Sequence, residues 1–205
     1  VSPYEYGVGS DSIKPILGSL QTLAARASIG GGTDNHIPGG RNARIGGGTE
    51  NVISGTTDGG ILSGYRNVIT QSQQSSIGGG RMNTIGTSTL SAQWSFIGGG
   101  YNNTIGGDRQ NSLSGSYGFI GGGKSNFVNA QYGSVVGGES NSVRAKYGSI
   151  VGGYSNYIAA ESTGGFIGGT YDGYIYTSPY GSIVGGYKMK MRGSEHSFIG
   201  GGDSR

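Results

Sequence analysis

Apolar positions return along this chain at a nearly constant interval. The recurring stretch is clearest in Ser28 to Ile37 and in Ser76 to Ile85, where a small residue precedes Ile, a Gly triplet, two variable residues, Asn, one variable residue and a second Ile. We call the first Ile the anchor, and eight of the ten steps between successive anchors are 15–17 residues. A fixed period of this kind is typical of a repeat architecture. The anchors expected from the pattern are Ile29, Ile45, Ile61, Ile77, Ile97, Ile120, Val135, Ile150, Phe166, Ile183 and Ile199.

Each unit contains two short strand candidates. One leads up to the anchor and the other covers the Asn-x-Ile segment, and both are bounded by Gly or Asn, which tolerate a positive φ. Two strands and two turns per unit predict an all-β fold, a parallel β-solenoid or β-roll of about 16-residue coils. Successive coils would stack through parallel ladders at about 4.8 Å, so the array is expected to be a rod of order 50 Å.

The third copy indicates which positions matter most. It has lost the first two glycines, at Leu62 and Ser63, but keeps its anchor, the third glycine Gly64 and Asn67. Asn tolerates the left-handed backbone region and bonds its own turn, and amides stacked one coil apart can also bond each other. We therefore expect a structural Asn column. Its members are Asn35, Asn51, Asn67, Asn83, Asn103, Asn126, Asn141 and Asn156.

The pattern divides the chain into two regions. Residues 1–27 are the least regular and are expected to form an N-terminal cap or leader, since terminal repeats are usually atypical. Residues 28–205 form the glycine-rich array, with insertions at Gly86 to Gln93 and at Gly106 to Ser116. Because the chain starts with Val and stops inside a motif copy, we expect it to be a piece of a longer fibre protein.

Composition narrows the class of fold. Of the 205 residues, 47 are Gly, and they occur in doublets and triplets rather than at every third position, which excludes collagen. The regular Ile and Val positions argue against disorder. A coil of this size cannot bury its own core, so we expect the array to be intertwined or packed as a homotrimer.

The sequence offers no catalytic or metal site. It has no Cys, and its two histidines, His36 and His196, lie in distant repeats, which disfavours a His-based triad or metal cluster. The Gly-rich segments lack the Gly-Lys-Ser/Thr ending of phosphate loops, so no cofactor is expected. A net charge of +3, dispersed along the chain, does not indicate nucleic-acid binding. No stretch is long and apolar enough to span a membrane.

Aromatic residues mark two candidate surface stripes, three residues before and four residues after the anchors. Such stripes suit glycan or receptor binding, although an aromatic ladder that only protects the solenoid edge explains them equally well. The two insertions break the repeat and are rich in Ser, Thr, Asn and Gln, so we expect them to form a collar that carries any specificity. The candidate ligand-binding residues are Trp94, Tyr101, Arg109, Tyr117, Tyr132 and Tyr147.

From Ser28 to Arg205 the repeated Ser-x-Ile-Gly-Gly-Gly-x-x-Asn-x-Ile unit resembles the head repeats of trimeric autotransporter adhesins. It is also similar to the Gly-Gly-Gly-x-x-Asn arrays in fibre proteins of phages and large viruses. The resemblance implies a left-handed parallel β-roll in a homotrimer, although the period here is longer than that of the adhesin heads and a Gly triplet replaces a shorter Ile-Gly unit.

This resemblance implies a non-enzymatic attachment segment of an extracellular fibre, on a virion or a bacterial cell surface, with a cell-surface glycan or receptor as partner. Two alternatives remain open. An ice-binding solenoid needs a regular Thr face, which Thr33 and Thr49 begin but Tyr65 and Arg81 interrupt. A glycan-degrading spike needs paired carboxylates, which a trimer seam could bring together.

Overall fold

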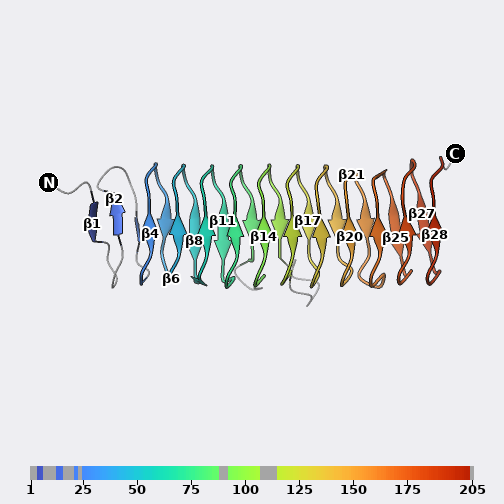
Figure 1. Cartoon of the computed structure of the whole chain (residues 1–205), viewed down its shortest axis with the longest axis horizontal. Helices are drawn as coiled ribbons and strands as arrows, with labels where there is room; N and C mark the ends of the chain where they lie inside the picture. Colours follow the sequence, from blue (N-terminus) through green and yellow to red (C-terminus); the bar gives the residue numbers. More distant parts are fainter. Residues whose placement is uncertain are drawn as a thin grey trace.

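The chain is a parallel β-solenoid whose coils stack in a single row from the N-terminal to the C-terminal end (Figure 1). The computed structural model describes residues 4–6, 13–15, 21–22, 25–87, 92–106 and 115–203. Every regular element in these ranges is a strand. The predicted all-β solenoid with coils of about 16 residues is confirmed, since strands of successive coils pair in parallel at this spacing.

Two long sheets form the walls of the solenoid. The 13-stranded sheet contains the anchors, and we call it the anchor sheet. Its strands, in spatial order, are β1 (Tyr4–Tyr6), β2 (Ile13–Pro15), β4 (Ser28–Ile29), β7 (Arg44–Ile45), β10 (Gly60–Ile61), β12 (Ser76–Ile77), β14 (Phe96–Ile97), β16 (Phe119–Ile120), β18 (Ser134–Val135), β20 (Ser149–Ile150), β23 (Phe166–Ile167), β26 (Ser182–Ile183) and β28 (Phe198–Ile199). Only β1 and β2 pair antiparallel; the other described pairs in this sheet are parallel.

The 11-stranded sheet contains the Asn-x-Ile segments, and we call it the Asn sheet. Its strands, in sequence order, are β3 (Gln21–Thr22), β5 (His36–Ile37), β8 (Val52–Ser54), β11 (Val68–Thr70), β13 (Thr84–Ile85), β15 (Thr104–Ile105), β17 (Phe127–Val128), β19 (Ser142–Val143), β22 (Tyr157–Ile158), β25 (Tyr174–Tyr176) and β27 (Lys190–Arg192). Two small parallel pairs lie outside these sheets: β6 (Gly40–Arg41) with β9 (Thr56–Thr57), and β21 (Gly153–Tyr154) with β24 (Thr170–Tyr171).

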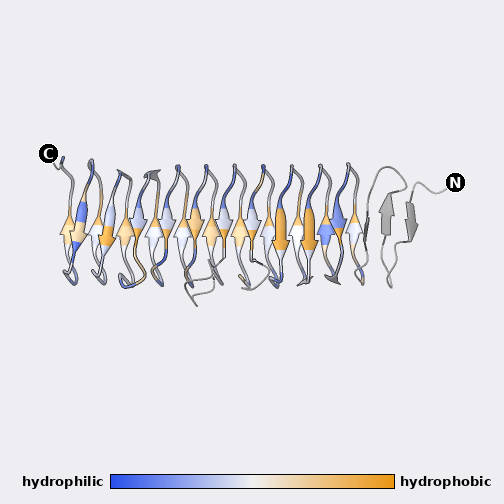
Figure 2. Cartoon of the chain, turned by 180° about the vertical axis from the view of Figure 1, so that it is seen from behind, coloured by the Kyte–Doolittle hydropathy of each residue, from blue (hydrophilic) through white to orange (hydrophobic). Residues whose placement is uncertain are grey.

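The core is a thin double column of β-branched side chains. Most strands are so short that they place one residue inward and its neighbour outward, because side chains alternate along a strand. The inward residues of the anchor sheet from Ile29 to Ile183 are at most 1% exposed, and those of the Asn sheet from Ile37 to Ile175 are fully buried. Figure 2 shows the apolar colours concentrated in the strands and the hydrophilic colours mainly in the connections between them.

One expected anchor is wrong. Ile167, not Phe166, pairs in register with Ile150 and Ile183 and is fully buried. Phe166 pairs with two serines on the outward side of β23 and is half-buried. Ile167 follows the arrangement of Phe96–Ile97 and Phe119–Ile120, in which the β-branched side chain is buried and the Phe ring lies outside.

With Ile167 as the anchor, the motif positions that follow it in this coil also shift by one residue. Counted from Phe166, the Asn position of this coil falls on Asp172, but Gly173 occupies it, and Thr170 replaces the third glycine. Asp172 instead takes the left-handed turn position beside it, with φ 63°.

Candidate binding surfaces

The Asn column forms a buried ladder at one corner of the solenoid. The backbone N–H of each member from Asn51 to Asn156 donates to the side-chain oxygen of the Asn one coil before, at 3.0–3.1 Å. Each amide nitrogen also donates to two glycine carbonyls or their equivalents, as Asn83 does to Gly79 at 3.0 Å and Gly100 at 3.1 Å. The ladder ends where the Thr170 hydroxyl donates to Asn156. These side chains are thus occupied by the fold and are not exposed to a ligand.

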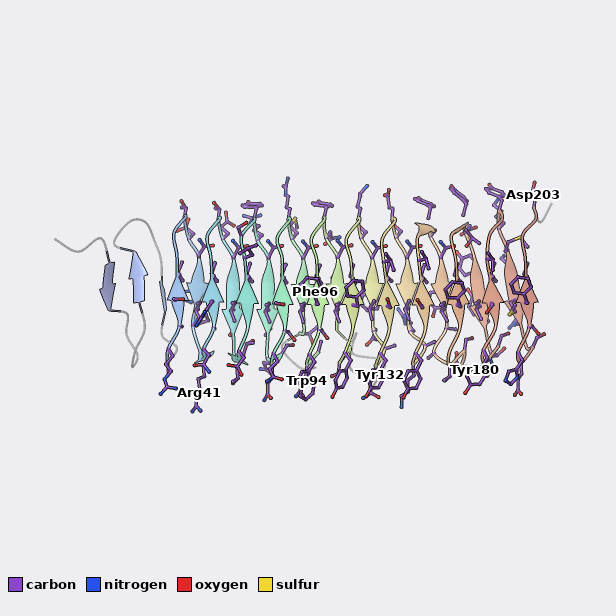
Figure 3. The ribbon with its side chains drawn as sticks, in the orientation of Figure 1. Arg41, Trp94, Phe96, Tyr132, Tyr180 and Asp203 are labelled. Atoms are coloured by element: carbon purple, nitrogen blue, oxygen red, sulfur yellow. The ribbon has the colours of Figure 1, made fainter. Side chains whose placement is uncertain are left out.

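Both narrow edges of the solenoid are built on left-handed backbone. Figure 3 shows Arg41, Trp94, Tyr132 and Tyr180 along its lower edge and Asp203 at its upper edge. At the lower edge one residue of each described coil has a φ of about +50 to +70°, including Trp94 at 53° and Tyr132 at 59°. Large side chains rarely adopt this conformation, so a compensating interaction is expected.

Stacked rings supply that compensation at the lower edge. Trp94, Tyr117, Tyr132 and Tyr147 stack in sequence with ring centroids 5.0, 4.7 and 5.0 Å apart. Gly164 interrupts the ladder, and Tyr180 then stacks on His196 at 4.9 Å. The rings therefore cover one another's faces and present mainly their edges to solvent.

The upper edge is a mixed ladder. It runs from Thr33 and Thr49 through the cation–π group of Tyr65, Arg81 and Tyr101 to the Lys124–Glu139 ion pair, whose Nζ and Oε1 atoms are 2.8 Å apart. This pairing raises the pKa of Lys124. Three stacked rings complete the edge; they belong to Tyr154, Tyr171 and Tyr187.

The candidate ligand-binding residues do not gather in one place. Trp94, Tyr117, Tyr132 and Tyr147 share the lower edge, but Tyr101 lies in the upper-edge ladder between Arg81 and Lys124. Tyr101 therefore does not flank the expected collar together with Trp94 and Tyr117. Arg109 and most of both insertions, residues 88–91 and 107–114, lie outside the described residues.

The outer face of the anchor sheet is nearly free of charge. Its outward residues immediately before and after the anchors are Gly, Ser, Phe, Leu or Val from β4 to β28, with Arg44 as the single charged exception among them. Several apolar side chains stand open to solvent, including Leu62 at 70% and Phe198 at 68% exposure. Between Arg44, Leu62 and Phe96 the glycine-floored surface is hollowed by about 440 Å³.

The outer face of the Asn sheet changes character towards the C-terminal end. Small residues such as Val68 and Thr84 give way to Tyr157, Tyr174 and Tyr176, followed by Lys190 and Arg192. A hollow of about 510 Å³ is lined by Asp172, Tyr174, Tyr176, Lys190 and Arg192.

The two tyrosine hydroxyls of this hollow have raised pKa values. The Tyr174 hydroxyl donates to the Asp172 carboxylate at 2.8 Å, and this hydrogen bond, with partial burial, raises the pKa of Tyr174. Burial likewise raises the pKa of Tyr176. Sequence reasoning missed this cluster, although reading both outward positions around each Asn-x-Ile segment would have revealed it.

The described ranges contain no group of three or more His, Cys, Asp or Glu side chains that could hold a metal ion. His36 lies on β5 near the N-terminal end, and His196 lies on the lower edge near the C-terminal end. A search of the same ranges for a helix long and apolar enough to cross a membrane finds none.

The chain was compared with protein-family models and with curated proteins. No protein-family model matches the chain, and no curated protein matches it either.

Proposed function

We propose that this chain is a non-enzymatic segment of an extracellular fibre that assembles as a homotrimer and serves attachment to a surface. The observation that carries the proposal is the uncharged outer face of the anchor sheet. Extended apolar surfaces on soluble proteins mark interaction sites, and interface cores are depleted of charged residues.

The periodicity of this face argues for a partner of the same kind. Its outward residues repeat at every coil along the described rod, so a matching partner must present side chains at the same spacing of about 4.8 Å. A second copy of the chain meets that requirement because its coils have the same spacing. Copies related by a three-fold axis parallel to the rod bring identical coils to the same height, with Phe and Val beside Gly-floored hollows.

The resemblance to trimeric adhesin heads and viral fibres supports three chains rather than two, and it supports a location on a virion or bacterial cell surface. With the anchor sheet turned inward, the Asn sheet and the edges form the exterior. A partner on a cell or glycan surface would then meet these surfaces.

The test introduces charge on the anchor sheet without changing its interior. Val136 and Val151 are 51% and 43% exposed and sit on neighbouring coils, so the V136D/V151D variant should fold. The matched control T84D/S142D places the same charges on the outer face of the Asn sheet. Light scattering and circular dichroism should give a β-rich trimer for the parent and control, and a β-rich monomer for V136D/V151D.

A parent chain that remains monomeric at micromolar concentration would refute the fibre assembly. If V136D/V151D stays trimeric while the control dissociates, the chains associate through the Asn sheet instead.

A further inference from the structure

We propose that the C-terminal part of the Asn sheet binds an anionic saccharide, a sugar chain bearing carboxylate or sulfate groups. The site is the outer face of β22, β25 and β27, near the C-terminal end of the rod in Figure 1. This inference rests on the proposed attachment function and names the class of ligand that the exterior of the fibre would meet.

Three tyrosine rings form the apolar part of the site. Tyr174 and Tyr176 belong to one strand, and their ring centroids are 5.7 Å apart with an interplanar angle of 4°. Tyr157, on the preceding coil, lies 5.6 Å from the Tyr176 ring at a tilt of 38°. Tyr174 and Tyr176 thus stack on each other, Tyr157 is tilted against them, and all three side chains stay partly exposed. A sugar ring can pack its C–H face against the exposed part of this cluster.

Two cations lie one coil beyond the rings. Register places Lys190 beside Tyr174 and Arg192 beside Tyr176. The Lys190 ammonium is 5.8 Å from the Tyr174 centroid, and both cations are exposed. Within the described ranges neither cation forms a salt bridge, and the Asp172 carboxylate accepts a hydrogen bond from the Tyr174 hydroxyl. The two cations can therefore pair with carboxylate or sulfate groups, and Arg is suited to bidentate contact.

The cationic surface continues towards the N-terminal end. The Arg144 guanidinium lies 5.8 Å from the Phe127 ring centroid and 5.9 Å from that of Tyr157. The strands β17, β19, β22, β25 and β27 are consecutive in the Asn sheet, so five adjacent coils each contribute an aromatic or a cationic side chain. A linear polymer with regularly spaced anionic groups fits this track better than a small compact ligand.

The charge of the hollow favours a saccharide over a nucleic acid. Lys190 and Arg192 against Asp172 leave a net charge of only about +1 at the hollow. Nucleic-acid sites instead need a basic stripe that neutralises a dense row of phosphates. The Asp172 carboxylate can in addition accept hydrogen bonds from sugar hydroxyls.

The experiment uses calorimetric titration of the full chain with four probes: a polyuronate oligosaccharide, dextran sulfate, neutral dextran and a single-stranded oligonucleotide. One or both anionic saccharides should bind, and the pair distinguishes carboxylate from sulfate recognition. Because charge-assisted hydrogen bonds are lost, K190Q/R192Q should weaken that binding by about tenfold or more. Tyr176→Leu should weaken it while leaving the charge unchanged.

The matched control is R41Q/R81Q, which removes the same formal charge from the two edges. It should bind like the parent. Four outcomes would each overturn the inference. These are an equal loss of saccharide affinity in both double variants, binding of neutral dextran as strong as that of the anionic saccharides, preferential binding of the oligonucleotide, and no binding of either anionic saccharide.

Light scattering on the same samples separates this inference from the fibre proposal. If the chain is monomeric and binds the saccharide through Lys190 and Arg192, the trimer proposal is wrong and the saccharide site stands. A trimer that binds neither anionic saccharide contradicts the saccharide site alone.

Discussion

At the scale of single residues, the corner beside the Asn ladder is closed mainly by glycines, and Thr170 takes this place in one coil. The third glycine of each triplet has a positive φ, 93° at Gly123, and a Cβ there would overlap the backbone of the next coil at Gly138. The middle glycine, Gly122, has open space around it and no positive φ. Neighbouring glycines in one triplet therefore have different roles.

Replacing Gly123 by Ala should consequently lower the free energy of unfolding by at least about 2 kcal/mol, because the new Cβ combines an unfavourable φ with a backbone overlap. Gly122→Ala is the control and should stay within about 0.5 kcal/mol of the parent. Urea denaturation at one fixed protein concentration measures both. Equal stabilities of the two variants would contradict the geometric account of the triplet.

The Asn ladder gives a second residue-scale prediction. Asn83→Ala removes the acceptor of the buried Asn103 N–H, at 3.0 Å, and the donor to two glycine carbonyls. Unsatisfied buried groups are expensive, so the loss should be about 3 kcal/mol. Thr84→Ala, on the outward side of β13, is the control and should melt close to the parent. A mild effect of Asn83→Ala would mean that water replaces the amide at this corner.

At the scale of elements, each lower-edge ring belongs to a residue in an unfavourable backbone conformation, which Asn42, Asp58 and Gln74 adopt at the same edge without a ring. Tyr132 stacks on Tyr117 at 4.7 Å and on Tyr147 at 5.0 Å while its φ is 59°. Removing the ring should cost about 1–3 kcal/mol for the two stacked pairs. The backbone strain then decides which small residue is tolerated best.

We therefore expect Tyr132→Gly to be more stable than Tyr132→Ala by about 1 kcal/mol, the reverse of the order seen in ordinary strands. Tyr132→Phe keeps both stacks and should match the parent. Thermal melts of the three variants under identical conditions test this order. If Tyr132→Ala melted at a higher temperature than Tyr132→Gly, the turn would not impose a positive φ on this residue.

The sequence pattern gave the wrong inward residue in one strand, β23. Wherever a single Ile or Val followed a Ser or Arg, as at Ile45 and Ile183, the pattern identified the buried residue. At Phe166 and Ile167 the spacing did not decide, because either choice leaves steps of 16 and 17 residues between Ile150 and Ile183. The equivalent pairs Phe96–Ile97 and Phe119–Ile120, in which Ile is buried, would have given the answer. The width of the interior decides, which is a property of stacked coils rather than of one repeat.

At the scale of the whole molecule, the solenoid and its coil length follow from periodicity because each coil contacts mainly its neighbours. The surfaces were harder to predict. Tyr101 and Trp94 lie near the same insertions in sequence but on opposite edges of the rod, since half a coil separates them. The Tyr174–Arg192 cluster was missed because its members come from consecutive coils and meet only after stacking.

The direction of the hydrogen bonds has a mechanical consequence. The backbone hydrogen bonds between coils join each coil to the next and are directed along the rod. A force that stretches the rod therefore acts on one set of these bonds after another. Under load a terminal coil should peel away first. A released coil of about 16 residues extends to roughly 55 Å, whereas it adds only about 4.8 Å when folded. Pulled from its ends, the chain would lengthen in discrete steps of about 50 Å, and each step would relieve the force on whatever the fibre holds.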